Sequence, residues 1–217
     1  MPNLKIGVFD SGIGGLSVAK AIERSLPSAE VIFVNDSAHV PYGTRSPEEI
    51  YSFVVPIFQE LVEQQCDAIV VACNTVSTNL IQQLREDFST VPLIAMEPMI
   101  KPAAEQTKSG VIAVCATPST LASQRYHYLK DTYAPGMVVL EPDCSDWSFL
   151  IEHNQMDDEI IRDRIQAVIA AGADVIVLGC THYHWIEDKI KDVAKEQAVV
   201  LQPEIPVIAQ LIKVLNI

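Results

Sequence analysis

Hydrophobic residues along this chain fall into short, nearly continuous runs that alternate with stretches of helical periodicity. The clearest runs are residues 67–75 and 174–182, in which an Asp is followed by four apolar residues, a small residue and a Cys. Runs that are apolar along their whole length are typical of parallel strands covered by helices on both faces. Because the alternation continues through the chain, the pattern predicts an α/β fold with mostly parallel sheets.

The same design occurs twice. Cys73 and Cys180 end the two clearest runs, and a second pair of similar runs, residues 6–11 and 112–117, is separated by nearly the same number of positions. In open α/β sheets, ligands bind beyond the carboxyl ends of the strands. We therefore expect two similar halves, each of which offers one strand-end thiol to a single site.

The repeat predicts two pseudosymmetric, doubly wound domains with the active site in the cleft between them. We expect residues 1–97 plus 206–217 to form the first α/β domain and residues 98–205 to form the second. The apolar spacing within residues 204–215 fits a helix that crosses back and packs on the first half.

Periodicity and turn residues also predict the individual elements. Strands are expected at residues 5–9, 31–34, 67–72, 91–95, 110–115, 137–140 and 174–178. Helices are expected at residues 16–26, 47–65, 77–88, 100–106, 118–130, 157–171 and 204–215, with an irregular stretch at 147–153.

Composition narrows the class of protein. The 217 residues, 49% of them hydrophobic, are enough for one large or two small domains. We expect a cytoplasmic protein, because no apolar run reaches the roughly 18 residues of a membrane span and the amino terminus does not resemble a signal peptide. Five cysteines without C-x-x-C spacing fit a reducing compartment. A net charge of −13 argues against nucleic-acid and membrane partners, although a local pocket of backbone amides can still bind a small anion.

A glycine-rich turn, residues 10–15, links the first strand to the first helix. Such turns present backbone amides to an anion, but the dinucleotide fingerprint fails because Ser17 stands where the third glycine belongs. Asp10 at the strand tip favours an ammonium over a phosphate, so an amino acid is a more suitable ligand for this turn than a nucleotide. The alternative is that Gly12, Gly14 and Gly15 serve backbone geometry alone.

The two strand-end thiols are the candidate chemistry. Polar residues follow each one directly, whereas a core cysteine such as Cys115 lies among apolar residues. Two thiols on opposite sides of a cleft suit removal of a proton from one face of a carbon and delivery to the other, which inverts a stereocentre. An ordinary thiol has a pKa near about 8.5, so neighbours such as His182 must assist.

A metal site is an alternative interpretation of the same region. Cys180, His182 and His184 are all types of side chain that bind zinc, but on one short strand end they do not converge easily into a tetrahedron. No lysine stands at a strand end near the two thiols. We therefore expect neither a metal nor a cofactor.

Four segments together resemble bacterial glutamate racemase, in the aspartate/glutamate racemase superfamily. They are residues 9–17 (FDSGIGGLS), 40–44 (VPYGT), 72–75 (ACNT) and 179–183 (GCTHY). The resemblance spans almost the whole chain. It implies a cofactor-independent isomerase that interconverts L- and D-glutamate by two-base proton transfer and supplies D-glutamate for peptidoglycan and cell wall biogenesis.

The same resemblance assigns roles to individual residues. It implies that the catalytic residues are Cys73, Cys180, His182, Asp10 and Glu152. The substrate-binding residues that it implies are Asp10, Ser11, Tyr42, Gly43, Asn74, Thr75, Thr117, Thr120, Thr181 and His182. The expected partner is glutamate itself, and a homodimer is left open.

Departures from the family pattern keep two alternatives open. Residues 35–39 (NDSAH) differ from the family's usual Gly-Asp-Thr-Ala-Arg, and His184 replaces a proline. We also expect the carboxyl-terminal extension common in the family to be missing. The alternatives are an aspartate racemase of the same superfamily and a racemase-like binding protein with little turnover. We expect ordinary roles for Cys66 and Cys144, and solvated or structural roles for His39, His127 and His153.

Overall fold

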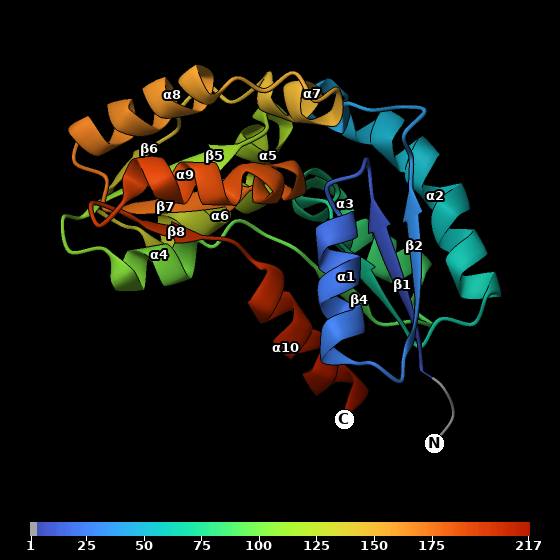
Figure 1. The fold of residues 1–217 in the computed structure, drawn as a ribbon. Helices are drawn as coiled ribbons and strands as arrows, with labels where there is room; N and C mark the ends of the chain where they lie inside the picture. The colour runs from blue at the N-terminus through green and yellow to red at the C-terminus, as the bar shows by residue number, and fades with distance from the viewer. Residues whose placement is uncertain (1–3) are drawn as a thin grey trace.

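The computed structural model describes residues 4–217 (Figure 1). The first half contains β1 (Lys5–Asp10), α1 (Leu16–Ser25), β2 (Glu30–Asn35), the 3-10 helix η1 (Tyr42–Thr44), α2 (Pro47–Glu63), β3 (Ala68–Val71), α3 (Asn74–Asp87) and β4 (Leu93–Ala95). The second half contains α4 (Ile100–Gln106), β5 (Val111–Ala116), α5 (Pro118–Ala122), α6 (Gln124–Tyr133), β6 (Val138–Leu140), α7 (Trp147–Glu152), α8 (Asp158–Ala170), β7 (Val175–Gly179), the 3-10 helix η2 (Thr181–Ile186), α9 (Glu187–Ala194) and β8 (Val199–Leu201). The last helix is α10 (Glu204–Leu215).

Residues 4–217 form two four-stranded parallel sheets with the same topology. The strand orders are β2-β1-β3-β4 and β6-β5-β7-β8, so that β3 and β7 occupy equivalent positions. This confirms the expected α/β fold of two pseudosymmetric, doubly wound halves. The carboxyl ends of β3 and β7 are the points at which Cys73 and Cys180 follow.

Both faces of the first sheet are covered, which explains its continuous apolar runs. Phe9, Ile69 and Val71 pack with α2 and α3, whereas Val8 and Val70 pack on the opposite face with α1 and α10. The second sheet is covered in the same way by α8 and α9 on one face and by α4 and α6 on the other. The hydrophobic core is therefore divided into one part on each face of each sheet.

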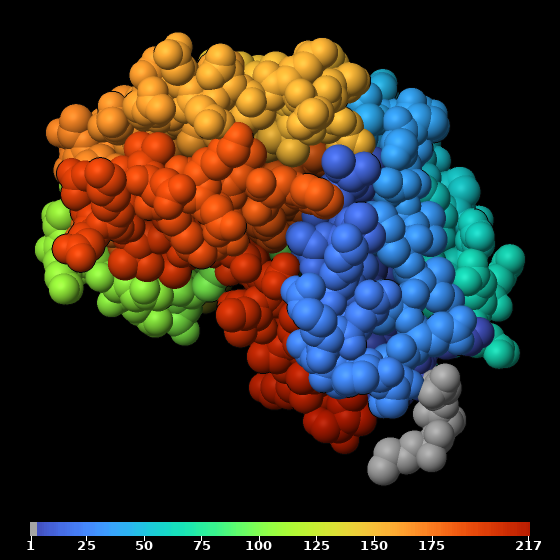
Figure 2. Space-filling model, in the orientation of Figure 1, coloured from blue at the N-terminus to red at the C-terminus, as the bar shows by residue number. Residues whose placement is uncertain are grey.

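The crossing of α10 back to the first half follows the sequence-based expectation. Val207, Ile208 and Leu211 are buried in the core part that contains α1, and Figure 2 shows α10 (red) against the amino-terminal segment (blue). The domain boundaries at residues 97/98 and 205/206 stay a prediction.

The structure corrects several expected elements. Residues 147–152 form helix α7 rather than an irregular stretch, and the helix expected at 118–130 is two helices because Ser123 caps the second one. Helix α3 begins at Asn74, three residues earlier than expected. The sequence analysis missed α9 and β8, which are only eight and three residues long. Short elements carry too few positions to establish a period.

Candidate active site

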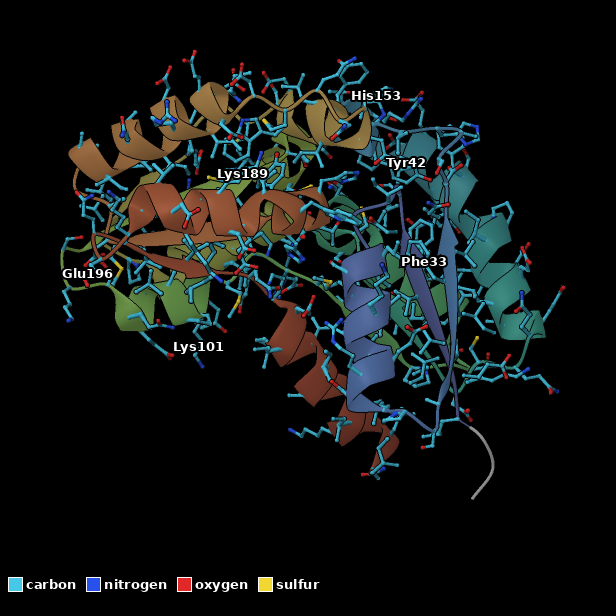
Figure 3. The ribbon with its side chains drawn as sticks, viewed as in Figure 1. Phe33, Tyr42, Lys101, His153, Lys189 and Glu196 are labelled. Carbon is cyan, nitrogen blue, oxygen red and sulfur yellow. The ribbon has the colours of Figure 1, made fainter. Side chains whose placement is uncertain are left out.

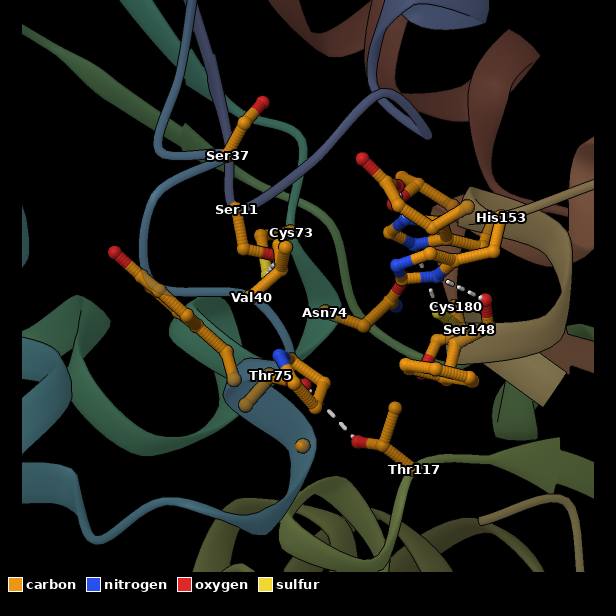
Figure 4. Close-up of a pocket in the computed structure, with 17 residues that line it drawn as sticks. Ser11, Ser37, Val40, Cys73, Asn74, Thr75, Thr117, Ser148, His153 and Cys180 are labelled. Atoms are coloured by element: carbon orange, nitrogen blue, oxygen red, sulfur yellow. Dashed lines mark hydrogen bonds and ion pairs between the residues drawn. The ribbon is translucent and has the colours of Figure 1, made fainter. Parts of the chain in front are cut away.

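A pocket of about 240 Å³ opens between the two halves (Figure 4). In that view Ser11, Ser37 and Val40 face Ser148 and His153 across the space, and Thr117 lies near Thr75. The volume is below the range of about 300–1,000 Å³ for drug-sized ligands, so the pocket suits a small molecule. Its lining consists of Ser11, Ser37, Val40, Pro41, Tyr42, Gly43, Cys73, Asn74, Thr75, Thr117, Ser148, Phe149, Glu152, His153, Cys180, Thr181 and His182.

Cys73 lies where β3 ends and α3 begins. It is the residue that precedes the first turn of α3, and its Sγ is 3.5 Å from the Ser11 hydroxyl. Burial, reinforced by the nearby charge of Asp10, raises the pKa of the Cys73 thiol well above its ordinary value. The hydroxyl of Ser11 and the Val76 amide act in the opposite direction but do not offset burial. Cys73 is therefore a protonated thiol at neutral pH.

Cys180 has a different set of neighbours. Its Sγ is 3.8 Å from His182 Nδ1, and His182 Nε2 is 2.5 Å from Glu152 Oε2. Burial disfavours the imidazolium, but the contacts with Cys180 and Glu152 outweigh it and hold the pKa of His182 well above its ordinary value. The hydrogen bond from His182 also lowers the pKa of Glu152. A charged imidazolium thus lies beside the Cys180 sulfur.

Asp10 does not line the pocket. It is fully buried, and its Oδ2 accepts hydrogen bonds from the Gly15 amide at 2.6 Å and the Thr181 hydroxyl at 3.2 Å. Burial raises the pKa of this carboxyl despite the opposing charge of His182. Asp10 therefore connects the glycine-rich turn of the first half to the Cys180 segment of the second.

The glycine-rich turn is a close packing surface between the halves. A Cβ on Gly12 would lie 2.8 Å from Glu152 Oε2, and a Cβ on Gly14 would lie 2.6 Å from the His182 backbone nitrogen. Two amides of the turn are already bound by protein carboxylates, since Ile13 donates to Glu152 and Gly15 donates to Asp10. The expectation that these amides are unpaired and face an anion is wrong for those two positions.

Hydroxyl groups of both halves meet at the other side of the pocket. Thr75 in the first turn of α3 is 2.9 Å from Thr117, and Thr117 donates to Thr120 at 3.0 Å. Thr120 is fully buried behind Thr117 and does not line the pocket. Asn74 donates from Nδ2 to the Met96 carbonyl, while its Oδ1 is buried without a hydrogen-bond partner among the described residues. The amide group of Asn74 is thus only partly satisfied by the protein.

Tyr42 and Gly43 line the pocket on η1, as the sequence suggested. The Tyr42 hydroxyl, however, donates to Asp36 Oδ2 at 2.6 Å, so it is already engaged. Burial, followed by this hydrogen bond, raises the pKa of Tyr42 above its ordinary value. A Cβ on Gly43 would lie 2.8 Å from the Thr117 Cβ, so glycine permits the two halves to approach here.

Sequence reasoning missed six lining residues. They are Ser37, Val40, Pro41, Ser148, Phe149 and His153. Val40 and Pro41 belong to the motif that contains Tyr42, and Ser37 lies just before it, so these three could have been inferred from the motif. The last three lie on or directly after α7, in the segment expected to be irregular, and only the position of Glu152 pointed to that segment.

The alternative of a metal site at Cys180, His182 and His184 finds no counterpart in the structure. Within residues 4–217, no group of three or more His, Cys, Asp or Glu side chains is arranged to hold a metal ion. The His184 ring instead lies with Nδ1 3.4 Å from the Ser17 hydroxyl.

Among the helices of the described chain, none combines the length and apolarity needed to cross a bilayer.

Comparison with known proteins agrees with this architecture. The model of the Asp/Glu/Hydantoin racemase family matches residues 6–209. The chain therefore belongs to this family of isomerases.

Individual relatives show which members of this racemase family the chain resembles. Glutamate racemase of Herpetosiphon aurantiacus is 42% identical over 205 residues, which cover 93% of this chain and 80% of that protein. The structure of Escherichia coli glutamate racemase in complex with L-glutamate and the activator UDP-MurNAc-Ala has a TM-score of 0.90 at 29% identity and covers 99% of this chain and 83% of that chain. That of Francisella tularensis glutamate racemase in complex with D-glutamate has a TM-score of 0.83 at 27% identity and covers 100% and 82%. Within the family, the chain groups with the glutamate racemases.

Proposed function

We propose that this protein interconverts L- and D-glutamate by proton transfer at Cα between two thiols. The observation that carries the proposal is that Cys73 and Cys180 follow equivalent strands of two pseudosymmetric halves and line the same pocket. A planar carbanion between two opposed acid–base groups can be reprotonated from the face opposite to the one that lost the proton. Inversion at Cα is the result.

The neighbours of the two thiols support one starting point for the cycle. The Cys180 thiolate, beside the His182 imidazolium, takes the Cα proton of one enantiomer, and the electron pair of the C–H bond passes to the carbanion. The Cys73 thiol then gives its proton to the opposite face of Cα and becomes a thiolate. The reverse reaction exchanges the two roles. By family resemblance we assign Cys180 to L-glutamate and Cys73 to D-glutamate.

Substrate binding relies on neutral polar groups. Asn74 and Thr75, in the first turn of α3, line the pocket, and helix amino termini favour carboxylates. Ser11 and Thr117 add hydroxyls from the two halves. We propose that these groups hold one carboxylate of glutamate, with Asp10, Thr120 and Tyr42 keeping the lining in place.

We also propose that the protein acts in the cytoplasm and supplies peptidoglycan synthesis. All five cysteines are free thiols, which fits the cytoplasm as a reducing compartment. D-glutamate formed there would supply peptidoglycan synthesis, and the reaction needs neither a metal nor a cofactor. The structure of the Escherichia coli relative was solved with L-glutamate, which supports glutamate over aspartate as the substrate.

Circular dichroism of L-glutamate incubated with the purified protein tests this function. We expect the signal to decay to zero as the racemic mixture forms, without added cofactor and equally after dialysis against a chelator. L-aspartate in a parallel sample should keep its signal. Faster decay with aspartate would favour the aspartate racemase alternative. Thermal stabilisation by glutamate without any decay would favour the binding-protein alternative.

A further inference from the structure

The mouth of the pocket carries an exposed aromatic pair on α7. Phe149 lines the pocket and is 46% exposed, so its ring is open both to the pocket and to solvent. The rings of Phe149 and His153 stack with their centroids 4.1 Å apart and an interplanar angle of 29°. His153 Nδ1 lies 2.9 Å from the Phe149 carbonyl oxygen, so Nδ1 is the donor of this hydrogen bond. We call these two residues the mouth pair.

The hydrogen bond determines what His153 can offer to a ligand. Because Nδ1 donates to the backbone, Nε2 is the nitrogen that remains for another partner. Stacking on Phe149 fixes the ring plane, so Nε2 is held in one direction. In Figure 3, His153 and Tyr42 lie near one another at the junction of the two halves, and both line the pocket.

The pocket lining contains few basic side chains that could bind an anionic ligand. None of the pocket-lining residues in the described chain is Lys or Arg, and the two imidazoles are those of His182 and His153. His182 is engaged with Glu152 and Cys180, which leaves His153 as the basic side chain of the lining that is free to meet a ligand. The chain as a whole has a net charge of −13 and repels an anionic amino acid.

We propose that the mouth pair is a specificity determinant, in which His153, supported by Phe149 and carrying a proton on Nε2 in the complex, binds a carboxylate of a dicarboxylic amino acid at the pocket mouth. The inference rests on the proposed function and adds to it a residue outside the proton-transfer machinery. His153 was expected to be solvated or structural, and its position at the pocket assigns it this further role.

The test compares His153→Gln with His153→Lys. An exposed ion pair contributes about 0.2–1 kcal/mol, which corresponds to about a 1.4- to 5-fold change in affinity. We expect His153→Gln to raise KM for both enantiomers by this factor at low ionic strength, with kcat within 2-fold of the parent. Lysine restores the charge and should restore KM. His127→Gln, on the outer helix α6, is the matched control and should change neither constant.

The platform role of Phe149 is tested in the same assay. Phe149→Ala removes the stacking partner, whereas Phe149→Tyr keeps an aromatic ring. If Phe149 acts by holding His153, Phe149→Ala should raise KM, Phe149→Tyr should not, and the double variant with His153→Gln should be no worse than the more affected single variant. Additive losses would contradict the platform role.

Two results would overturn the proposal. One is an unchanged KM in His153→Gln, and the other is a loss that lysine does not restore. The parent is assayed first, because absence of parent turnover counts against the proposed racemase function and not against the mouth pair. In that case the Kd for L-glutamate, measured by calorimetry in the same variants, replaces KM and carries the same expected changes.

Discussion

The two halves of the molecule share one topology but surround their thiols differently. Cys73 precedes a long helix and has the Ser11 hydroxyl 3.5 Å away, whereas Cys180 precedes a 3-10 helix and has an imidazole that is itself bound to a carboxylate. Burial keeps Cys73 protonated, while an imidazolium stands ready to stabilise a thiolate at Cys180. A duplicated scaffold therefore places the two thiols symmetrically, and the local sequences after the strands give them unequal neighbours.

This inequality has a definite kinetic consequence. L- and D-glutamate have equal free energies in water, so kcat/KM must be the same in both directions whatever the environment of each thiol. The difference between the halves can appear only in kcat and KM separately and in reactions confined to one face of Cα. Isotope exchange at Cα is the measurement that isolates one face.

Replacing either thiol should have the largest effect. Cys73→Ala and Cys180→Ala each remove one acid–base group, so we expect racemisation to fall roughly 10²- to 10⁴-fold in both directions. In heavy water, Cys73→Ala should retain Cα exchange of L-glutamate, and Cys180→Ala that of D-glutamate, as followed by proton NMR.

The matched control for these variants is Cys66→Ala. Cys66 is a buried thiol just before the amino end of β3, at the opposite end of the strand from Cys73 and outside the pocket lining. Its replacement should leave turnover close to that of the parent. Near-parental racemisation by either active-site variant, or exchange lost from the same enantiomer in both, would show that the thiols do not flank Cα.

The fold was largely predictable because its signals are local. Runs such as residues 68–71 are buried on both faces, and that condition leaves an unbroken apolar pattern in the sequence. Helix α7 was not predicted because it has six residues, of which only Trp147 and Ser148 are buried, so its sequence shows no clear helical period. The start of α3 was misplaced because Asn74 and Thr75 are polar yet buried beside the pocket.

The site was predictable only in part, for a related reason. The motifs identified the residues at the strand ends, but pairs that join distant segments leave no local pattern. The contact of Glu152 with Ile13 is one example, and that of Thr75 with Thr117 is another. Asp10 is a further example, because its position at a strand tip suggested substrate contact, which stays a prediction, while its Oδ2 joins the two halves through Gly15 and Thr181.

An intermediate effect is expected from Glu152→Gln, which weakens only the Cys180 side. A hydrogen bond to a charged group contributes about 1.5–3 kcal/mol, so we expect kcat to fall on the order of 10- to 100-fold. Because Glu152 raises the pKa of His182, its loss lowers that pKa, and the alkaline limb of the rate profile should move to lower pH.

Glu141→Gln is the matched control for this change. Glu141 also lies in the second half and pairs with Lys130 and Tyr126, but it does not line the pocket. Its replacement should leave both kcat and the pH profile unchanged. An unaltered alkaline limb in Glu152→Gln would mean that the carboxylate does not act through the imidazole.

The smallest effect on activity is expected at His184, which differs from its neighbour His182 in the sign of its pKa shift. Burial, together with the charge of His182, lowers the pKa of His184 to about 4. The unfolded chain, with an ordinary pKa near about 6.5, then binds this proton more readily than the folded protein below that pH. Folding stability should therefore be unaffected above about pH 7 and fall as the pH drops from about 6.5 towards 4, by up to about 2 kcal/mol at pH 5.

His184→Gln should remove this acid sensitivity while leaving kcat near the parent value, because His184 does not line the active-site pocket. Urea unfolding at pH 7 and pH 5 gives the comparison, with the exposed His127→Gln as control. Glutamine can keep a hydrogen bond to Ser17, which His184 makes across the two halves, so the loss at pH 7 should be small. His182 has the opposite dependence, since its raised pKa contributes stability below about pH 6.5 that is lost as the pH rises. The difference between parent and variant isolates His184 from that background, and an equal loss of stability at pH 5 in both proteins would rule out its buried ring as the acid-sensitive group.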